Sequence, residues 1–247
     1  HGGTRAMAAG KSHAEYLMFM TQDAIPADQY LIERLLKAMT QDPMIGAAYA
    51  RQLPTADCGM IERYTREFNY GENSRIKTAD DIPKMGIKTF FCSDVCAMYR
   101  RNIYLSVGGF IRHTIFNEDM ICAATMIQKG YKVAYAAEAR VIHSHNYTAM
   151  EQFHRNFDLA VSQADHPEIF HGIASEGEGI RLVKKTAGYL IKKKYYFLLP
   201  ALIWQSGWKY LGYRAGKKYQ RLPKKLILKF TSDKSYWEKK NLQNITD

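Results

Sequence analysis

The sequence lacks several features that mark particular classes of protein. It has no secretory signal and no run of about eighteen uncharged apolar residues, so an ordinary membrane span is not expected. Its four cysteines form no C-x-x-C pair and no zinc-type set with histidines. This favours reduced thiols in a reducing compartment over disulfides or structural zinc. Internal repeats are also absent. The sequence begins without an initiator methionine, which favours a start inside a longer sequence.

The charge is distributed unevenly along the 247 residues. The net charge is +11, yet residues 180–247 alone carry 17 lysines and arginines against 3 acidic residues. The preceding part of the chain is therefore close to neutral. The composition, 47% hydrophobic and 24% charged, is that of a globular protein large enough to bury a core. The sequence thus predicts a nearly neutral body and a strongly basic region after it.

The stretch FMTQDAIP, residues 19–26, places one aspartate after an apolar run. The run YLMFM suits a strand buried on both faces of a parallel sheet, or a short buried helix segment. After a strand, Asp23 would lie at the sheet edge where open α/β folds bind ligands. The alternative is a turn or helix cap, because a helical pattern runs from Asp28 to about residue 40.

Further strands are predicted before residue 150, and polar side chains end each of them. MIGAAYARQLP predicts a strand that ends at Arg51 and Gln52, and TFFCSD predicts one that runs into Asp94. YKVAYA and ARVIHSH predict two more. If the last strand continues, His143 and His145 point the same way because side chains alternate with a period of two.

A second acidic position, Glu118-Asp119, opens a helix predicted to run to about Lys129. The first turn of a helix favours anions, so capping alone explains this placement. A functional interpretation makes one carboxylate a general base. Together with Asp23 and the His-x-His pair, it predicts a site for a divalent cation and an anionic substrate. Residues 55–88, in contrast, predict a short helix followed by a partly mobile excursion.

The basic region mixes lysine clusters with leucine, isoleucine, tyrosine and tryptophan. An apolar helix face with basic flanks is typical of proteins that lie in a membrane interface, and lysines are attracted to anionic lipids. A helical hairpin packed on the body with a solvated lysine face explains the same pattern. Nucleic acid would also accept such charge, but no recognition module is present.

Seven motifs occur in a characteristic order: HGGTR, FMTQDAIP, RQLP, FFCSDVCAMYRR, GGF, NED and GYKVAYAAEARVIHSH. This order resembles the family 2 glycosyltransferases of the GT-A fold, most closely their bacterial rhamnosyltransferase branch. The resemblance covers residues 1–150 and continues more loosely through KYLGYRAGKKYQRLP. It implies an α/β, Rossmann-like GT-A mixed sheet flanked by helices, N-terminally truncated, in residues 1–150. Residues 151–247 would form a helical, basic, aromatic-rich region that associates with membranes.

The resemblance also implies roles for individual residues. Asp119 matches the family's catalytic base, with Glu118 beside it. Asp23 matches the second aspartate of the D-x-D-type motif, which binds the metal on the donor diphosphate. A histidine that ends the following strand is often a metal ligand, which points to His143 or His145.

The donor-binding residues implied by the resemblance and by the strand ends are Arg5, Thr21, Gln22, Asp23, Arg51, Gln52 and Asp94. Two positions depart from the family pattern. Thr21 stands where the motif has its first aspartate, which weakens the expected metal and ribose contacts, and Ala6 replaces the usual asparagine. The family's first strand and the acidic loop after its second strand are not in this chain. The chain as given is therefore expected to bind a sugar nucleotide poorly.

The implied function is inverting transfer of a deoxyhexose to a hydroxyl of a growing surface polysaccharide or lipid-linked glycan. L-Rhamnose from dTDP-rhamnose is favoured, and another nucleotide sugar is the alternative. The expected cofactor is Mg²⁺ or Mn²⁺. The expected partners are the nucleotide sugar, the polysaccharide or lipid-linked acceptor and an anionic membrane surface, without nucleic acid, for a cytoplasmic enzyme peripheral on the inner face of the plasma membrane.

Two rival hypotheses remain. A non-catalytic membrane-associated scaffold would use the basic region and would treat the carboxylates as helix caps. A nucleic-acid-binding protein would use the same charge and would bind with an affinity that falls steeply with salt.

Overall fold

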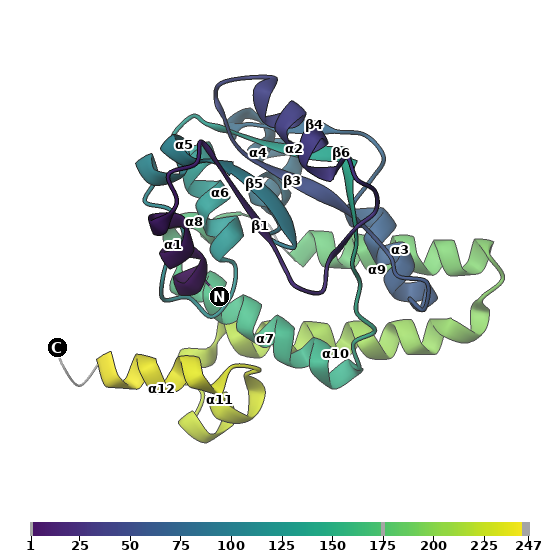
Figure 1. The fold of residues 1–247 in the computed structure, drawn as a ribbon. Coiled ribbons are helices and arrows are strands. Elements are labelled where there is room, and N and C mark those ends of the chain that lie inside the picture. The colour runs from purple at the N-terminus through teal and green to yellow at the C-terminus, as the bar shows by residue number, and fades with distance from the viewer. Residues whose placement is uncertain (1, 174–175, 244–247) are drawn as a thin grey trace. The chain divides into compact units, whose positions relative to one another are not determined.

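The structure is a computed structural model that describes residues 2–173 and 176–243 (Figure 1). The chain divides into two compact units. The first consists of His1–Arg112, Glu118–Asn146 and Gly172–Thr186, and the second consists of His113–Asn117, Tyr147–His171 and Ala187–Asp247.

A six-stranded mixed sheet forms the centre of the first unit. Its strands are β1 (Tyr16–Met20), β2 (Ile25–Pro26), β3 (Ile45–Leu53), β4 (Arg75–Lys77), β5 (Cys96–Arg100) and β6 (Lys132–Ile142). The order is β1-β5-β3-β6-β2, and β4 pairs with β6 off this path. β3 and β6 run parallel, whereas β1–β5, β3–β5, β2–β6 and β4–β6 are antiparallel. The predicted α/β mixed sheet flanked by helices is confirmed.

Helices precede, separate and follow the strands. The first unit contains α1 (Gly2–Lys11), α2 (Leu31–Thr40), α3 (Met60–Asn69), α4 (Ile82–Met85), α5 (Arg101–Ser106) and α6 (Glu118–Gln128), with 3₁₀ helices η1 (Ala79–Asp81) and η2 (Gly86–Phe90). α9 (Glu176–Lys192) begins in the first unit and ends in the second. The second unit contains α7 (Ala149–Asp165), α8 (Pro167–Phe170), η3 (Tyr196–Leu198), α10 (Leu199–Lys217), η4 (Tyr219–Arg221), α11 (Lys224–Phe230) and α12 (Lys234–Gln243).

Helix α2 covers one face of the sheet. Its apolar residues Leu31, Leu35 and Met39 recur every four positions and therefore share one side of the helix. All three are buried in a cluster that includes Ile45 of β3 and Val141 of β6. The helix predicted in this region is thus confirmed, and it forms because its apolar stripe has a sheet to cover.

The opposite face carries an aromatic cluster. Phe19 of β1 and Tyr99 of β5 contact each other and Phe110 edge to face, with ring centroids 5.1 to 5.8 Å apart. Tyr104 closes the cluster against Phe110. Gly109 has a φ of 68°, and a Cβ there would lie 2.7 Å from the Tyr104 ring, so this turn requires glycine.

Strand β1 differs from its prediction. The strand itself forms over YLMFM, but it lies at the end of the sheet order and pairs antiparallel with β5. The expectation of a strand within a parallel sheet is wrong. A continuous apolar run indicates that both faces of a strand are buried. In β1, Met18 packs into the cluster beneath α2 and Phe19 packs into the aromatic cluster. The run does not indicate the direction of the neighbouring strand.

The segment before β5 also differs. Residues 55–88 contain α3 and β4 as well as short helices, and the mobility expected for part of this segment stays a prediction. No strand runs into Asp94 in the described chain, because η2 ends at Phe90 and a turn follows, with Cys96 N–H donating to the Ser93 carbonyl. The apolar run TFF reflects the burial of Phe90. It does not reflect an extended backbone.

The two strands predicted over YKVAYA and ARVIHSH are one strand, β6. Its register against β3 shifts at the middle, where Ala50 pairs with Ala136 and the next residue, Arg51, pairs with Arg140. The extra residues of β6 form a bulge-like irregularity. The sequence pattern on either side of it was therefore interpreted as two separate strands. β6 ends at Ile142, so both histidines lie beyond it.

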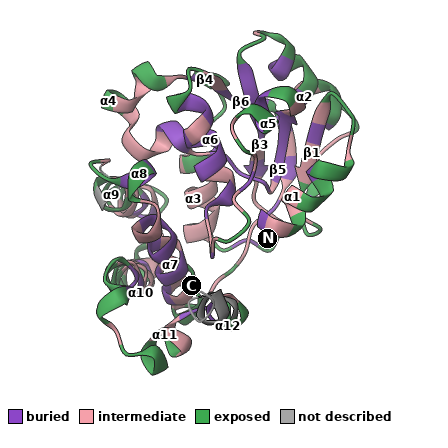
Figure 2. Cartoon of the chain, turned by 90° about the vertical axis from the view of Figure 1, so that its left-hand side faces the viewer, coloured by how far each residue is buried: buried purple, intermediate pink, exposed green. Residues whose placement is uncertain are grey.

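The second unit is held together by α7 and α10. Much of α7 is buried (Figure 2), and its residues Phe157 and Val161 join a cluster with Tyr219 and Trp237. α10 approaches α7 closely at Gly212 and Gly216. A Cβ at Gly212 would lie 2.2 Å from the Phe153 carbonyl oxygen, so the contact depends on the absence of a side chain.

The predicted division between residues 150 and 151 stays a prediction. The compact units change at residue 147 and interleave, because residues 113–117 belong to the second unit and residues 172–186 belong to the first. Every described element from Ala149 onward is a helix. None of the helices in the described residues has the length and apolar character needed to cross a bilayer.

Candidate active site

Sheet pairing brings Asp23 beside the two histidines. β2 runs antiparallel to the end of β6, with Ile25 opposite Ile142, so the residues before Ile25 lie next to those after Ile142. Asp23 Oδ2 is 3.4 Å from Nε2 of His143 and 3.3 Å from Nε2 of His145. The two imidazole rings meet edge to face at 4.6 Å. The three side chains therefore converge as the sequence predicted, through pairing of β2 rather than through extension of β6.

The side chain of Gln52 fixes the orientation of His143. Gln52 Nε2 donates to the hydroxyls of Tyr70 and Ser93, at 2.6 and 2.9 Å. Its Oε1 accepts from Arg66, which has only donors, and lies 3.1 Å from His143 Nδ1. Because Oε1 can only accept, Nδ1 must carry the proton of a neutral His143. Nε2 then carries a lone pair that is directed at Asp23.

This arrangement fits a divalent cation. Burial, with Arg66 and His145 nearby, lowers the pKa of His143 to about 4, so the ring is neutral near pH 7. Its Nε2 lone pair and the Asp23 carboxylate are two acceptors that face each other without a proton between them. A metal ion bound by one carboxylate oxygen and two imidazole nitrogens would resolve this contact, and the three ligand atoms lie within 4.8 Å of one another. Such a ligand set suits Mn²⁺ and zinc-like ions better than Mg²⁺, which prefers oxygen ligands.

Thr21 and Gln22 complete the turn before Asp23. The Thr21 hydroxyl, together with the two histidines, lowers the pKa of Asp23, which keeps the carboxylate ionised. The Thr21 N–H donates to the Val95 carbonyl, which ties the turn to the segment that follows Asp94. Gln22 is exposed.

A second cluster contains three carboxylates and one arginine. Arg5 of α1 forms an ion pair with Glu118 at the start of α6, and its Nε lies 3.5 Å from Asp94 Oδ2. Asp119 accepts a hydrogen bond from the Asp94 N–H at 3.1 Å. One cation thus faces Asp94, Glu118 and Asp119 in a largely buried setting. Arg5, predicted as a donor-binding residue, is held by these carboxylates.

Asp119 has the environment of a general base. Its second oxygen accepts from the N–H of Met120 at 2.7 Å, so the first turn of α6 fixes the carboxylate. Burial and the charge of Glu118 raise its pKa, and the hydrogen bonds and Arg5 oppose that rise only in part. The side chain remains partly accessible. A partly accessible carboxylate with a raised pKa can accept a proton near neutral pH.

Asp94 is more deeply buried than Asp119. It is 2% exposed, and its Oδ1 accepts from the Tyr99 hydroxyl at 2.6 Å. Burial and the charge of Asp119 raise its pKa, more strongly than Arg5 lowers it. Asp94 therefore tends to hold a proton, which relieves repulsion with Asp119.

Arg51 lies apart from both clusters. It is next to Gln52 on β3, so its side chain points to the opposite face of the sheet from that of Gln52. Its guanidinium lies 3.4 Å from the Glu72 carboxylate. Gln52 instead joins the clusters, because it contacts His143 and also Ser93, the neighbour of Asp94.

Sequence reasoning missed the residues that support these side chains. Arg66 and Tyr70 hold Gln52, and Tyr99 holds Asp94. Ser93 directly precedes Asp94, so the sequence could have indicated it as a site residue. Arg66 lies in α3 and Tyr70 directly follows it, and no local pattern in the sequence indicates their contact with Gln52.

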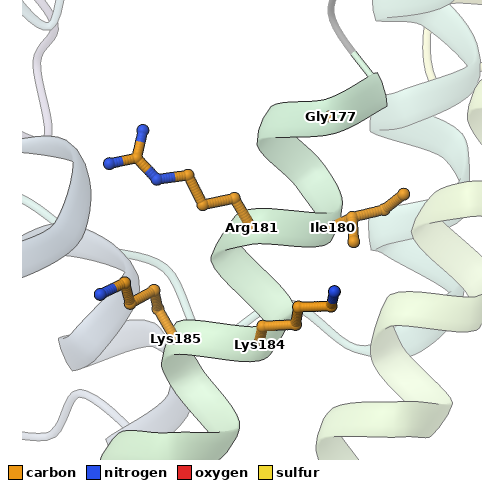
Figure 3. A pocket seen from close by; sticks show the side chains of 5 residues that line it. All are labelled: Gly177, Ile180, Arg181, Lys184 and Lys185. Carbon is orange, nitrogen blue, oxygen red and sulfur yellow. The ribbon is translucent and has the colours of Figure 1, made fainter.

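One hollow in the described surface lies elsewhere. A volume of about 520 Å³ is lined by Gly177, Ile180, Arg181, Lys184 and Lys185 of α9. Arg181 and Lys185 extend to one side of the helix and Ile180 and Lys184 to the other (Figure 3). None of these residues belongs to the two clusters, and Arg181 is paired with Glu178 of the same helix.

Comparisons with known proteins agree with this architecture. Residues 1–108 match the family described as glycosyl transferase family 2. The O-antigen chain rhamnosyltransferase RfbN of Salmonella typhimurium is 45% identical over 96% of this chain and 76% of that protein. The O-antigen chain rhamnosyltransferase WbaN of Salmonella anatum is 43% identical over 96% of this chain and 75% of that protein.

A solved structure shows the same fold. It is a mannosyltransferase from Pyrobaculum calidifontis in complex with GDP-Man and Mn²⁺, with a TM-score of 0.50 and 14% identity. The match covers 99% of this chain and 63% of that chain, so this chain spans less than two thirds of the archaeal structure. The GT-A fold predicted from the motifs is therefore confirmed. With relatives at 43 to 45% identity over nearly its whole length, the chain belongs to glycosyl transferase family 2 and is a glycosyltransferase.

Proposed function

We propose that the protein is an inverting rhamnosyltransferase that moves L-rhamnose from dTDP-rhamnose to a hydroxyl of a growing surface polysaccharide or lipid-linked glycan. The observation that carries the reaction is the pair of adjacent clusters, a carboxylate with two imidazoles and a partly accessible carboxylate at a helix start. The donor sugar is supported by the two O-antigen rhamnosyltransferases of similar sequence.

Asp119 acts as the base in this proposal. It would take the proton of the acceptor hydroxyl as the bond to the anomeric carbon forms, and the diphosphate leaves on the opposite face of the sugar. Such a base contributes about 10²- to 10⁴-fold to the rate. The ion pair between Arg5 and Glu118 holds α1 against the start of α6. A proton on Asp94 would reduce the repulsion between the carboxyl groups of Asp94 and Asp119.

Asp23, His143 and His145 would hold a divalent cation. When bound, the ion would supply charge stabilisation for the departing diphosphate. The archaeal mannosyltransferase of similar fold holds Mn²⁺ with its nucleotide sugar, which supports Mn²⁺ over Mg²⁺ here, as the ligand types also do. Gln52 orients His143 for this role. Thr21, Gln22 and Arg51 stay predictions as donor-binding residues.

We further propose that the enzyme works in the cytoplasm, on the anionic inner face of the plasma membrane, without a nucleic-acid partner. The support is the basic, aromatic character of the helices from α9 onward. A lipid-linked acceptor would be met there at high local concentration.

Donor turnover tests the proposal. The purified protein is incubated with dTDP-rhamnose or with UDP-sugars, and release of the nucleotide diphosphate is measured after chelation and after addition of Mn²⁺ or Mg²⁺. Turnover of dTDP-rhamnose that is lost with chelator and restored by Mn²⁺ is expected. Turnover of a UDP-sugar alone would replace the donor, and turnover that ignores the chelator would remove the metal. No turnover with any donor would favour the non-catalytic scaffold.

A further inference from the structure

Helix α10 has two apolar faces, and the second unit covers one of them. The covered face includes Leu202 and the glycines Gly212 and Gly216. A Cβ at Gly216 would lie 2.3 Å from the Phe157 carbonyl oxygen, which shows how closely α7 approaches. This contact accounts for the apolar residues on one side of α10 and leaves the other side to be explained.

The other side, here called the outer face, consists of Ile203, Trp204, Tyr210 and Leu211. Their side chains are exposed by 70%, 62%, 54% and 54%. At 100° per residue these positions fall within an arc of roughly 120°, so they form one continuous stripe. Exposed apolar residues are ordinary when scattered singly, whereas a contiguous stripe indicates an interaction surface.

The turn before α10 extends the stripe. Tyr196 and Phe197 of η3 are 56% and 73% exposed, and Ile191 at the end of α9 is 49% exposed. Between them lie Lys192, Lys193 and Lys194, all exposed, here called the lysine turn. Aromatic side chains and lysines thus occupy one short segment.

The backbone of the lysine turn is unusual. Lys194 has a φ of 63°, a left-handed conformation that glycine or asparagine adopts more easily at a helix end. The Tyr195 N–H donates to the Leu190 carbonyl at 2.8 Å, which closes this helix end. A lysine therefore occupies a position that favours glycine, and it adds a third cation to this turn.

The charge along the segment that carries the stripe has one sign. Residues 187–232 contain no aspartate or glutamate. Arg214 and Lys217 continue the direction of the outer face along the last turn of α10. A symmetric contact between two copies through this face would bring two lysine turns together without any carboxylate to offset them, so a second copy is a poor occupant.

We propose that the α10 outer face, with Phe197 and the lysine turn, docks onto an anionic lipid bilayer. Trp204, Tyr210 and Phe197 would lie at the level of the headgroups with α10 in the plane of the membrane, and the lysines would contact the lipid phosphates. This deepens the membrane association proposed above by assigning it to one surface. It is independent of the donor and of the reaction.

Co-sedimentation with vesicles tests the proposal with the whole chain. Phosphatidylcholine vesicles are compared with vesicles that also contain about one third phosphatidylglycerol. The chain should sediment with the anionic vesicles, and salt should weaken the binding. The variant Phe197→Ser/Ile203→Ser/Trp204→Ser should bind about tenfold or more weakly. The variant Lys192→Gln/Lys193→Gln/Lys194→Gln should lose most of its preference for anionic vesicles.

A control variant removes three exposed apolar side chains elsewhere. Met7→Ser/Ile32→Ser/Leu105→Ser changes three exposed apolar side chains of α1, α2 and α5 and should bind like the wild type. Circular dichroism verifies that each variant is folded. Absence of wild-type binding, or equal binding by the outer-face variant, would overturn the proposal. Loss of self-association in that variant, without any vesicle binding, would assign the face to a second copy instead.

The readouts separate this proposal from the proposed reaction. Vesicle binding needs no nucleotide sugar, so it stands if no donor is turned over. Conversely, transfer to a water-soluble acceptor should be unchanged in the outer-face variant, because none of its three residues belongs to the site clusters.

Discussion

Nε2 of His143 faces Oδ2 of Asp23 across 3.4 Å, while Nδ1 of the same ring contacts Gln52. A divalent cation bound between these two acceptors would stabilise the contact, and the low pKa of His143 makes a proton a poor alternative near neutral pH. The metal-binding role of Asp23 stays a prediction.

Substitution of Gln52 by leucine should weaken metal binding. The change removes the acceptor of His143 Nδ1, so the ring is free to turn, and it leaves Arg66 with Glu62 as its remaining partner. Loss of such a support typically costs about 10- to 100-fold in metal affinity. Titration of Mn²⁺ followed by calorimetry measures it. Arg51→Leu, at the neighbouring residue on the opposite face of β3, is the control, and an equal loss there would contradict the role of Gln52.

Substitution of Asp119 by asparagine should lower kcat by about 10²- to 10⁴-fold. The amide keeps nearly the same shape but cannot accept the hydroxyl proton, so KM for the donor should change little. Steady-state kinetics separate the two effects. The exposed carboxylate of Asp80 provides the control, because Asp80→Asn should have no effect. A variant whose kcat is preserved would remove Asp119 as the base.

The acidic cluster should make stability fall as pH rises. Burial raises the folded-state pKa values of Asp94 and Asp119 above the ordinary value of about 3.9. The folded state therefore binds more protons than the unfolded state above about pH 4, and the free energy of unfolding decreases with pH until both groups are ionised. In Asp94→Asn this decrease between about pH 5 and 8 should be smaller. Urea denaturation across this range measures it, and an unchanged slope would contradict the assignment.

Two glycines of α10 should respond oppositely to alanine. At Gly212 a Cβ would lie 2.2 Å from the Phe153 carbonyl oxygen, so Gly212→Ala should destabilise the fold by about 1–3 kcal/mol. At Gly207 nothing lies within 4 Å, so Gly207→Ala should stabilise the helix by about 0.5–1 kcal/mol. Denaturant unfolding compares the two. Equal effects would show that α7 and α10 do not pack closely at Gly212.

Local patterns in the sequence were sufficient where one residue and its neighbours decide the structure. The strand over YLMFM, helix α2 and the start of α6 at Glu118 follow from apolar runs, apolar periodicity and acidic residues in a first turn. The antiparallel direction of β1 and the bulge in β6 depend on distant partners, so the same patterns missed them.

The site shows the same limit. Asp23, His143, His145, Glu118 and Asp119 could be predicted because motifs carry them, and their roles stay predictions. The hydrogen-bond partners of Gln52 could not be predicted, because Arg66 and Tyr70 reach it only after α3 has folded back toward β3. Asp94 was expected as the end of a strand, and it instead lies in a turn where its backbone N–H contacts Asp119.

The most direct measurement is transfer of rhamnose from dTDP-rhamnose to a lipid-linked acceptor, with wild type, Asp119→Asn and Asp23→Asn compared in the presence of Mn²⁺. The account predicts transfer by the wild type, a loss of about 10²-fold or more in Asp119→Asn, and weakened dependence on Mn²⁺ in Asp23→Asn. Equal transfer by all three proteins, or no transfer by the wild type with any nucleotide sugar, would contradict it.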